Sequence, residues 1–272
     1  FTLAQLQALN GTQTVNTGEG VLTLNSYSGT ATGGTVNYTY TLSATIDNDS
    51  KPGATGTEFN DSVEITVNGV GGTTASDQLV IAIIDDVPSA VNDGPFGVTE
   101  DAAPNAVSGN VTGNDSSGAD APLEFVSWDG ATGDDLSAYG TLVQNPTTGA
   151  WSFTLNNSLA ATQALTSADV KTAVYSYTIK DADGDLDTAT LTVTVTGAND
   201  GATVETPNAE GADSTVYEAG LPTGSDVQPS DRDIASNTFT VSATDGIATV
   251  VIGGTSFTLA QLQALNGTQT VN

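Results

Sequence analysis

The chain has 272 residues and carries 32 acidic against 4 basic side chains, which gives a formal net charge of −28. This balance excludes a nucleic-acid binder that works through basic patches, and it also excludes a polybasic membrane anchor. Cysteine and histidine are absent, so disulfides, zinc–thiolate sites and His-based catalysis are excluded as well.

Sequence patterns typical of β-strands dominate the chain. Apolar runs rich in Val, Ile, Leu and Thr alternate with turns rich in Gly, Asn, Asp and Thr, which favours antiparallel β-sandwiches over a parallel sheet. Short helices beside a sheet are expected at 3–9, at its copy 259–265, and at 167–174. The clearest expected strands lie at 63–67, 79–84, 151–155, 174–179 and 191–197.

Trp151 alternates with Phe153 along one of these strands. Alternation places both rings on the same face of the strand, as core residues require. A sugar-stacking surface built from the tryptophans and tyrosines is the alternative, and the periodicity favours the core.

The chain repeats itself at two levels. Residues 1–16, FTLAQLQALNGTQTVN, recur unchanged at 257–272, and we interpret the chain as a window on a longer repeating sequence. A weaker internal repeat aligns 140–155 with 20–42, and 174–195 with 62–83.

These repeats predict an all-β array of two related β-sandwiches in series. One sandwich is expected to be complete at 86–199. The other is divided between 1–85, its C-terminal part, and 200–272, its N-terminal part. Neither part is expected to bury a core alone, so we expect its partner to be a neighbouring repeat or a head-to-tail copy of the chain.

Several segments resemble repeats of giant secreted bacterial proteins. YSYTIKDADGDLDTATLTVTVTGAND, with VTEDAAPNAVSGNVTGND, is similar to a VCBS repeat, which is a cadherin-like Ig sandwich. VYEAGLPTGSD, DGIATVVIGGTSFTLAQLQAL and LVIAIIDDVPSA resemble the long repeat of type I secreted giant proteins. The resemblance covers nearly the whole chain. It implies the extender region of an RTX-type adhesin, a Ca²⁺-stiffened, non-enzymatic array that holds a binding tip away from the bacterial cell surface and supports biofilm formation.

The acidic residues gather at one expected domain junction. DADGDLD joins the last two strands of the 86–199 sandwich, and in an up-and-down seven-stranded order that hairpin returns to the pole where the domain begins. Carboxylates so close together repel unless a cation lies among them, and Ca²⁺ takes about six to eight oxygen ligands. A solvated acidic hairpin is the alternative. The predicted ligands are Asp181, Asp183, Asp185 and Asp187 of the hairpin, Asp85, Asp86, Asn92 and Asp93 of the entry segment, and Asp47 and Asp49 of the preceding corner loop.

Weaker candidate ligands lie elsewhere. Asn199, Asp200 and Glu218 surround the second junction, where the equivalent hairpin is glycine-rich and a solvated linker is the alternative. Ordinary loop turns are the alternative for the two remaining pairs. Those pairs are Asp115 with Asp120, and Glu100 with Asp101.

Three functions compete for this pattern. The first is a calcium-stabilised extracellular spacer, and the second is a calcium-dependent, lectin-like binding sandwich. Near-identical tandem repetition argues against the second, because a selected pocket is normally displayed once or a few times. A hydrolase is disfavoured, since no nucleophile–base pair and no cleft-lining aromatic pattern single out one acid pair.

Overall fold

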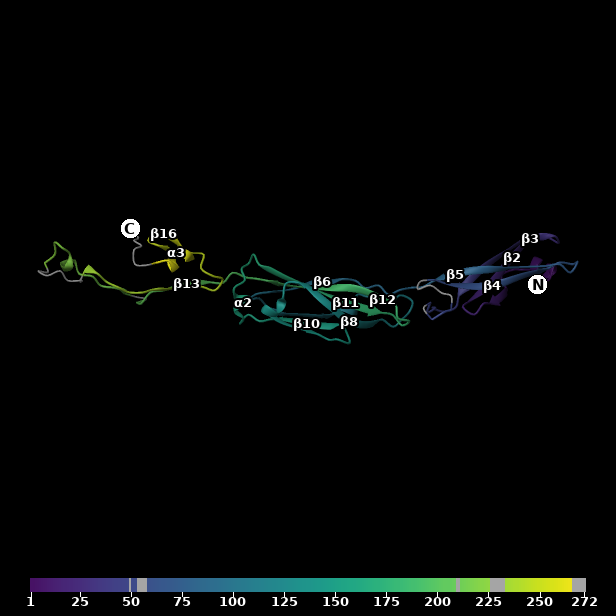
Figure 1. The fold of residues 1–272 in the computed structure, drawn as a ribbon, viewed down its shortest axis with the longest axis horizontal. Helices are drawn as coiled ribbons and strands as arrows, with labels where there is room; N and C mark the ends of the chain where they lie inside the picture. The colour runs from purple at the N-terminus through teal and green to yellow at the C-terminus, as the bar shows by residue number, and fades with distance from the viewer. Residues whose placement is uncertain (49, 53–57, 209–210, 226–232, 266–272) are drawn as a thin grey trace.

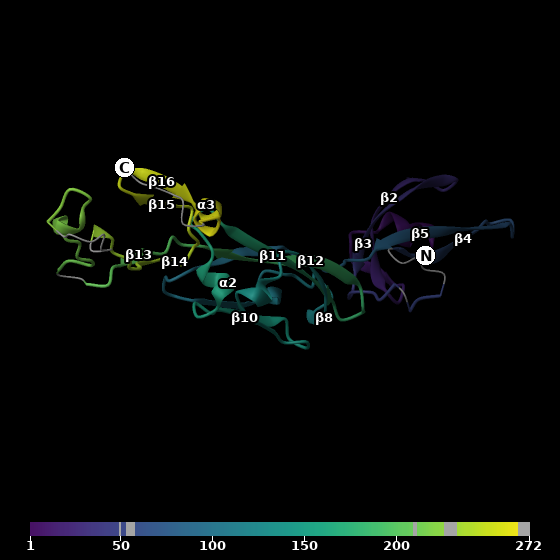
Figure 2. The same ribbon diagram turned by 60° about the vertical axis from the view of Figure 1, so that its left-hand side comes forward.

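The computed structural model describes residues 1–48, 50–52, 58–208, 211–225 and 233–265. We refer to residues 1–85 as the N-terminal unit, to 86–199 as the central domain and to 200–272 as the C-terminal unit. The three lie in an extended row with the central domain in the middle (Figures 1 and 2). Within the described part, strands far outnumber helices, which confirms the all-β fold class.

The N-terminal unit combines a three-stranded sheet, in the order β1-β2-β3, with a separate β4–β5 hairpin. The predicted helix near the start is present, and it begins with a capping box between Thr2 and Gln5. The buried cluster of this unit is small and centres on Leu9, Leu22 and Leu24. The elements are α1 (Leu3–Gln7), β1 (Gln13–Asn16), β2 (Gly20–Thr30), β3 (Gly33–Leu42), β4 (Glu58–Asn68) and β5 (Thr74–Ile84).

The central domain is a sandwich of two sheets, with strand orders β7-β10-β9 and β6-β12-β11-β8. Strand β6 runs parallel to β12, whereas the other pairs are antiparallel. The elements are β6 (Asp93–Thr99), β7 (Ala106–Asn110), η1 (Val111–Gly113), β8 (Glu124–Gly133), η2 (Leu136–Ala138), β9 (Gly140–Gln144), β10 (Ala150–Leu155), α2 (Ala160–Gln163), β11 (Val170–Lys180) and β12 (Leu186–Thr196).

This strand order corrects the predicted up-and-down arrangement. Strands β6, β7 and β8 pair with β12, β10 and β11 rather than with one another. The chain crosses between two sheets to enclose one core, so neighbours in sequence are not always neighbours in a sheet. The first and last strands nevertheless run in the same direction, and this places the β11–β12 hairpin at the pole where the domain begins.

The helix predicted at 167–174 is wrong. Asp169 closes a turn by accepting hydrogen bonds from the backbone and hydroxyl of Thr166, and β11 begins directly afterwards at Val170. Val170, Thr172 and Val174 are β-branched residues at alternate positions, and this pattern fits a pleated strand better than a helix.

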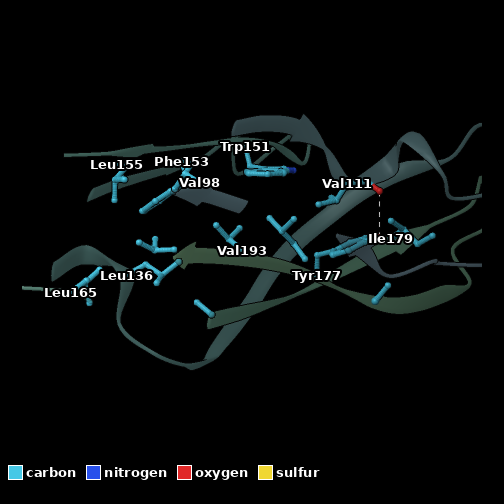
Figure 3. Close-up of a cluster of buried hydrophobic side chains, with 14 residues drawn as sticks. Val98, Val111, Leu136, Trp151, Phe153, Leu155, Leu165, Tyr177, Ile179 and Val193 are labelled. Atoms are coloured by element: carbon cyan, nitrogen blue, oxygen red, sulfur yellow. Dashed lines mark hydrogen bonds between the residues drawn. The ribbon is translucent and has the colours of Figure 1, made fainter. Parts of the chain in front are cut away.

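Alternating side chains build the core of the central domain. On β10, Trp151 and Phe153 are 4% and 0% exposed, which confirms the core position predicted for the pair. The ring of Trp151 packs 5.1 Å from that of Phe96. Figure 3 shows these side chains facing those of β11 and β12, including Tyr177 and Val193, across the sandwich.

The C-terminal unit consists of two strand pairs, β13–β14 and β15–β16, followed by a helix. That helix begins with the same capping box as α1, here between Thr258 and Gln261. The elements are β13 (Ala202–Glu205), η3 (Glu218–Gly220), β14 (Thr240–Ala243), β15 (Thr249–Ile252), β16 (Thr255–Thr258) and α3 (Leu259–Gln263).

Truncating the core should unfold the central domain selectively. We expect Phe153→Ala to lower the free energy of unfolding by about 3–5 kcal/mol, because it leaves a cavity between the sheets. Urea titration followed by tryptophan fluorescence measures this directly, since both tryptophans, Trp128 and Trp151, lie in this domain. The matched control is Val143→Ala at a side chain 58% exposed, expected to change stability by less than about 0.5 kcal/mol. Equal effects of the two substitutions would contradict the assignment of the core.

Candidate metal centre

The hairpin between β11 and β12 is organised around Asp181. One oxygen of its carboxylate accepts hydrogen bonds from the backbone N–H groups of Gly184 and Asp185 at 3.1 and 2.9 Å. Gly184 has a φ of +114°, which favours glycine at this turn. Asp181 is only 1% exposed. The turn therefore brings the carboxylates of the hairpin together around the buried side chain of Asp181.

Carboxylates from three chain segments converge at this hairpin. In each of two triads, one oxygen per residue lies within 4.8 Å of the others, and Asp183 belongs to both triads. Asp120 is held beside the hairpin because its carbonyl accepts a hydrogen bond from the N–H of Ala182 at 2.9 Å. We call the following set the junction cluster. Its triads are Asp85, Asp120 and Asp183, and Asp181, Asp183 and Asp185.

Several buried atoms of this region lack hydrogen-bond partners. Neither carboxylate oxygen of Asp183, nor the second oxygen of Asp181, has a partner among the residues that the structure describes. Asn48 lies close to Asp85, since its backbone N–H is among the groups that lower the pKa of that carboxyl against the larger effect of burial. Asn48 is 1% exposed, and neither polar atom of its side chain has a partner in the described ranges. Buried polar groups in folded proteins normally have partners, so these orphaned oxygens point to a cation.

The electrostatics of the cluster agree with this interpretation. Burial and the neighbouring Asp181 carboxyl raise the pKa of Asp183 to about 7. Burial, followed by the charges of Asp185 and Asp120, also raises the pKa of Asp85. The three lysines of the described ranges form ion pairs outside the cluster, with Glu19, Asp169 and Glu124. Repulsion among these carboxylates is therefore not balanced by those lysines.

The linker residues predicted as ligands fasten the linker to the central domain. Asp86 accepts a hydrogen bond from the N–H of Ala119 at 2.7 Å. This contact is close to Gly118, whose φ is +68° and where a Cβ would lie 2.6 Å from the Asp86 carboxylate. Asn92 accepts hydrogen bonds from Thr190. These linker side chains therefore have hydrogen-bond donors within the protein. The donor to Asp86 is a backbone N–H, and the donors to Asn92 are the backbone N–H and the hydroxyl of Thr190.

The remaining residues predicted as ligands of the main junction lie in different surroundings. The Asp187 carboxylate accepts a hydrogen bond from the N–H of Ala90 at 2.7 Å. Asp47 accepts from the N–H of Ser50, and it lines a pocket together with Asp120 and Asp183. Asp49 lies outside the described residues. Asp120, a weaker candidate in the sequence, thus belongs to the junction cluster itself.

Asp93 and Asp115 meet at the hydroxyl of Tyr177 inside the central domain. Four oxygens surround this hydroxyl, those of Asp93 and Val91 at 3.1 Å, Asp115 at 3.2 Å and Val111 at 3.3 Å. Figure 3 shows the bond from Tyr177 to Val111 at the end of the core. A hydroxyl carries one proton and cannot donate to all four oxygens at once. Burial raises the pKa of Asp93 to about 6 and also raises the pKa of Asp115, although the hydrogen bond from Tyr177 acts in the opposite direction on both.

A second acidic group lies where the central domain meets the C-terminal unit. Glu100 is 1% exposed and accepts hydrogen bonds from the N–H of Ala198 and the side chain of Gln163. Burial, followed by the charges of Asp245 and Asp101, raises the pKa of Asp200. Asp245 was not among the predicted ligands, because its Asp-Gly pair is typical of an ordinary turn.

The other residues predicted for the second junction lie apart from this group. Asn199 accepts a hydrogen bond from the N–H of Ser167 at 2.8 Å. Glu218 belongs to η3, which lies at the end of the C-terminal unit farthest from the central domain (Figures 1 and 2). The structure therefore does not bring Glu218 together with Asn199 and Asp200.

Comparison with known families agrees with the sandwich topology. Residues 85–196 match the family described as Bacterial Ig domain. The central domain thus has an Ig-like sandwich fold, and we call it the Ig-type domain. No curated protein matches the chain. Among the helices in the described ranges, none is long and apolar enough to cross a membrane.

Solved structures of cadherin domains also resemble the chain. Mouse clustered PcdhgC3 EC1-3 is similar at 13% identity and a TM-score of 0.28, over 68% of this chain and 54% of that one. Protocadherin Gamma B2 extracellular cadherin domains 1-5 are similar at 15% identity and a TM-score of 0.30, over 77% of this chain and 36% of that one. The chain thus spans about half or less of these structures. Because the TM-scores are low, the fold assignment rests on the strand pairing and the family match.

The acid pair at Tyr177 should make the stability of the Ig-type domain depend on pH. The folded-state pKa of Asp93, about 6, lies above the ordinary value of ~3.9, so folding favours the protonated acid. The contribution of this group to the free energy of unfolding is present in full below about pH 4 and is lost as the pH rises through about 6. We expect Asp93→Asn to be more stable than the parent at pH 8, by an amount on the order of 1 kcal/mol after allowance for solvent screening.

This prediction is checked by urea titration of calcium-free protein at pH 4 and pH 8. The advantage of Asp93→Asn should largely disappear at pH 4, where Asp93 is protonated in the folded state and about half protonated in the unfolded state. Asp77→Asn, at an exposed acid on β5, is the control and should show no such pH-dependent gain. A substitution that destabilises the domain equally at both pH values would contradict the proposed protonation of Asp93.

Proposed function

We propose that this chain is a calcium-stabilised spacer of a bacterial cell-surface adhesin, with the junction cluster as its Ca²⁺ site. One observation carries the proposal. Two carboxylate triads share Asp183 at the joint between two domains, and buried oxygens of Asp181 and Asp183 have no hydrogen-bond partner among the described residues.

The donor set fits Ca²⁺ better than other common metals. The candidate ligands are carboxylate and amide oxygens, which are the ligands that hard cations prefer. The chain has no cysteine or histidine to select zinc or copper. The residues that would hold the ion are Asp85, Asp120, Asp181, Asp183 and Asp185, together with Asn48. When bound, the ion supplies the positive charge that offsets the repulsion among these groups.

The position of the cluster supports a mechanical role. Asn48 and Asp85 belong to the N-terminal unit, whereas the hairpin belongs to the Ig-type domain, so ligands of one ion would come from both sides of the joint. Holding these groups together restricts bending at the joint, whereas removing the ion leaves carboxylates that repel one another. The extended row of units in Figure 1 is the shape that such a spacer needs.

The wider setting follows from the sequence. Its repeats and its resemblance to RTX-type extender regions support a location outside the bacterial cell, in a type I secreted protein that mediates adhesion and biofilm formation. Ig-type domains are typically structural modules rather than enzymes. Extracellular modules bind Ca²⁺ with Kd values of ~10⁻⁴–10⁻³ M, so Ca²⁺ at millimolar concentrations outside the cell would load the site, whereas low Ca²⁺ inside the cell would leave it empty.

Calcium should stabilise the chain through Asp183. At a Ca²⁺ concentration about 100 times the Kd, binding adds roughly 2.7 kcal/mol to the free energy of unfolding. We expect Asp183→Asn to lose most of this gain. Without Ca²⁺, the same substitution should raise the melting temperature, because it removes one charge from a crowded acid cluster.

The measurement is thermal unfolding with Ca²⁺ and with chelator, paired with small-angle X-ray scattering for the maximum dimension. Asp77→Asn removes one exposed charge far from the hairpin and should respond to Ca²⁺ like the parent chain. A damaged fold would lower the melting temperature of Asp183→Asn in both conditions, so the opposite signs distinguish loss of a ligand from loss of structure. The spacer mechanism is wrong if neither the melting temperature nor the maximum dimension changes when Ca²⁺ is removed.

A further inference from the structure

We infer that Asp86 is a positioning residue of the junction cluster, which holds Asp85 and Asp120 against each other for the ion and does not bind the ion itself. This role rests on the proposed function, because the ion is the Ca²⁺ proposed there. It differs from the role that the sequence predicted for Asp86, which was that of a ligand.

The linker runs antiparallel to a loop of the Ig-type domain. Ser89 and Ser116 form a β-bridge, with hydrogen bonds of 2.8 and 3.0 Å between their backbone groups. Three residues earlier in the linker, Asp86 accepts a hydrogen bond at 2.7 Å from the N–H of Ala119, which lies three residues later in the loop. Both contacts therefore fit one antiparallel register, in which a step back along the linker matches a step forward along the loop.

The next step in this register reaches the cation site. It sets Asp85 of the linker opposite Asp120 of the loop, and these two carboxylates belong with Asp183 to one triad whose oxygens lie within 4.8 Å of one another. The contact between Asp86 and Ala119 thus immediately precedes a pair of candidate ligands. Carboxylates this close repel one another, so a contact that holds their backbones together prepares the site for an ion.

Gly118 fits closely around the Asp86 carboxylate. Its φ is +68°, in the left-handed region that glycine adopts without strain. A Cβ at this position would lie 2.6 Å from Oδ2 of Asp86 and 3.2 Å from the carbonyl oxygen of Val87. The loop therefore approaches the linker more closely than a residue with a side chain would allow, and it does so beside the acceptor of the hydrogen bond.

The same loop is fastened to the acidic hairpin on its other side. The carbonyl of Asp120 accepts a hydrogen bond from the N–H of Ala182 at 2.9 Å, and Ala182 lies between two of the hairpin's candidate ligands. The loop thus connects the linker to the hairpin, with the Asp86 side chain at the linker end. Loss of that contact would separate Asp85 from Asp120 and leave the ligands of the hairpin in place.

The surroundings of Asp86 differ from those of the candidate ligands. Asp86 belongs to neither carboxylate triad of the described ranges, and its side chain is exposed, whereas Asp120 and Asp181 are buried. Residues that hold a metal ligand in place typically change metal affinity by about 10–100-fold when they are lost. Because an exposed contact contributes little to the fold, loss of Asp86 should appear in the Ca²⁺ affinity and not in the stability of the calcium-free chain.

Two substitutions at Asp86 separate a positioning residue from a ligand. Asp86→Ala removes the acceptor and should weaken Ca²⁺ binding by roughly 10-fold, measured as a Kd by isothermal titration calorimetry on the whole chain. Asp86→Asn keeps an oxygen that can accept the N–H of Ala119, and it should bind within about threefold of the parent, because the charge that it removes is exposed and screened by salt. A ligand would lose affinity in both variants. Equal losses in the two variants, or no loss in either, would overturn the inference.

Gly118→Ala tests the same contact while every carboxylate stays in the chain. The added Cβ displaces the Asp86 carboxylate, so Ca²⁺ binding should weaken about as much as in Asp86→Ala. Gly72→Ala is the matched control, because Gly72 has a φ of +82° but nothing lies within 4 Å of the added Cβ. It introduces comparable backbone strain and should keep the Kd of the parent. The same Kd in both glycine variants contradicts the positioning role.

Calcium-free protein shows whether the contact itself has been broken. In chelator, hydrogen exchange of residues 115–120, followed by mass spectrometry, should be faster in Asp86→Ala than in Asp86→Asn, while the melting temperature stays close to that of the parent. Equal exchange, or a large fall in the melting temperature, would overturn the inference, since the latter assigns Asp86 to the fold. A parent chain that shows no heat of Ca²⁺ binding contradicts the proposed function as well. A parent that binds Ca²⁺ no more tightly than Asp86→Ala overturns the positioning role alone.

Discussion

Carboxylates packed together without a balancing positive charge are the constraint on which the rest of this structure depends. Two unit charges within 4.8 Å repel by about 3–4 kcal/mol at an effective dielectric constant of ~20. The junction cluster contains several such pairs, and their sum is comparable with the ~5–15 kcal/mol that stabilises a whole domain. Protons or a cation must therefore reduce the charge whenever this joint is closed, and at neutral pH a divalent cation does so more completely than a single proton.

The Ig-type domain provides a rigid base for this cluster. Tyr177 and Ile179 are fully buried on β11, just before the hairpin begins, so the acidic turn is fixed to the core. The linker is tied to the same base, because Asp86 and Asp187 each accept a hydrogen bond from a backbone N–H across the linker contact. Neutralising the cluster therefore changes the attachment of the N-terminal unit rather than the shape of the domain that carries the hairpin.

The sequence predicted features that depend on neighbours along the chain. Alternation identified the strands and the core position of Trp151, and the acidic run identified the hairpin. Asn48 was not predicted, and Asp120 was predicted only as a weaker candidate, because each approaches the hairpin through tertiary contacts between distant loops. Asp93 was grouped with the junction because it lies near it in sequence, although β6 turns its carboxylate toward Tyr177. Residues that meet through folding need the pairing of strands, which one sequence does not specify.

The two joints of the chain differ for a reason that lies in their hairpins. The β4–β5 hairpin corresponds to the acidic β11–β12 hairpin, but its loop reads Gly-Val-Gly-Gly-Thr at 69–73 in place of Asp-Ala-Asp-Gly-Asp. In a repeating array this loop faces the joint of Glu100, Asp200 and Asp245, which then has fewer carboxylates to neutralise. Under the proposed function, calcium would consequently act more strongly on one joint than on the other. An array built from such units would then alternate joints whose stiffness follows Ca²⁺, as proposed, with joints whose stiffness depends mainly on hydrogen bonds such as that from Ala198 to Glu100.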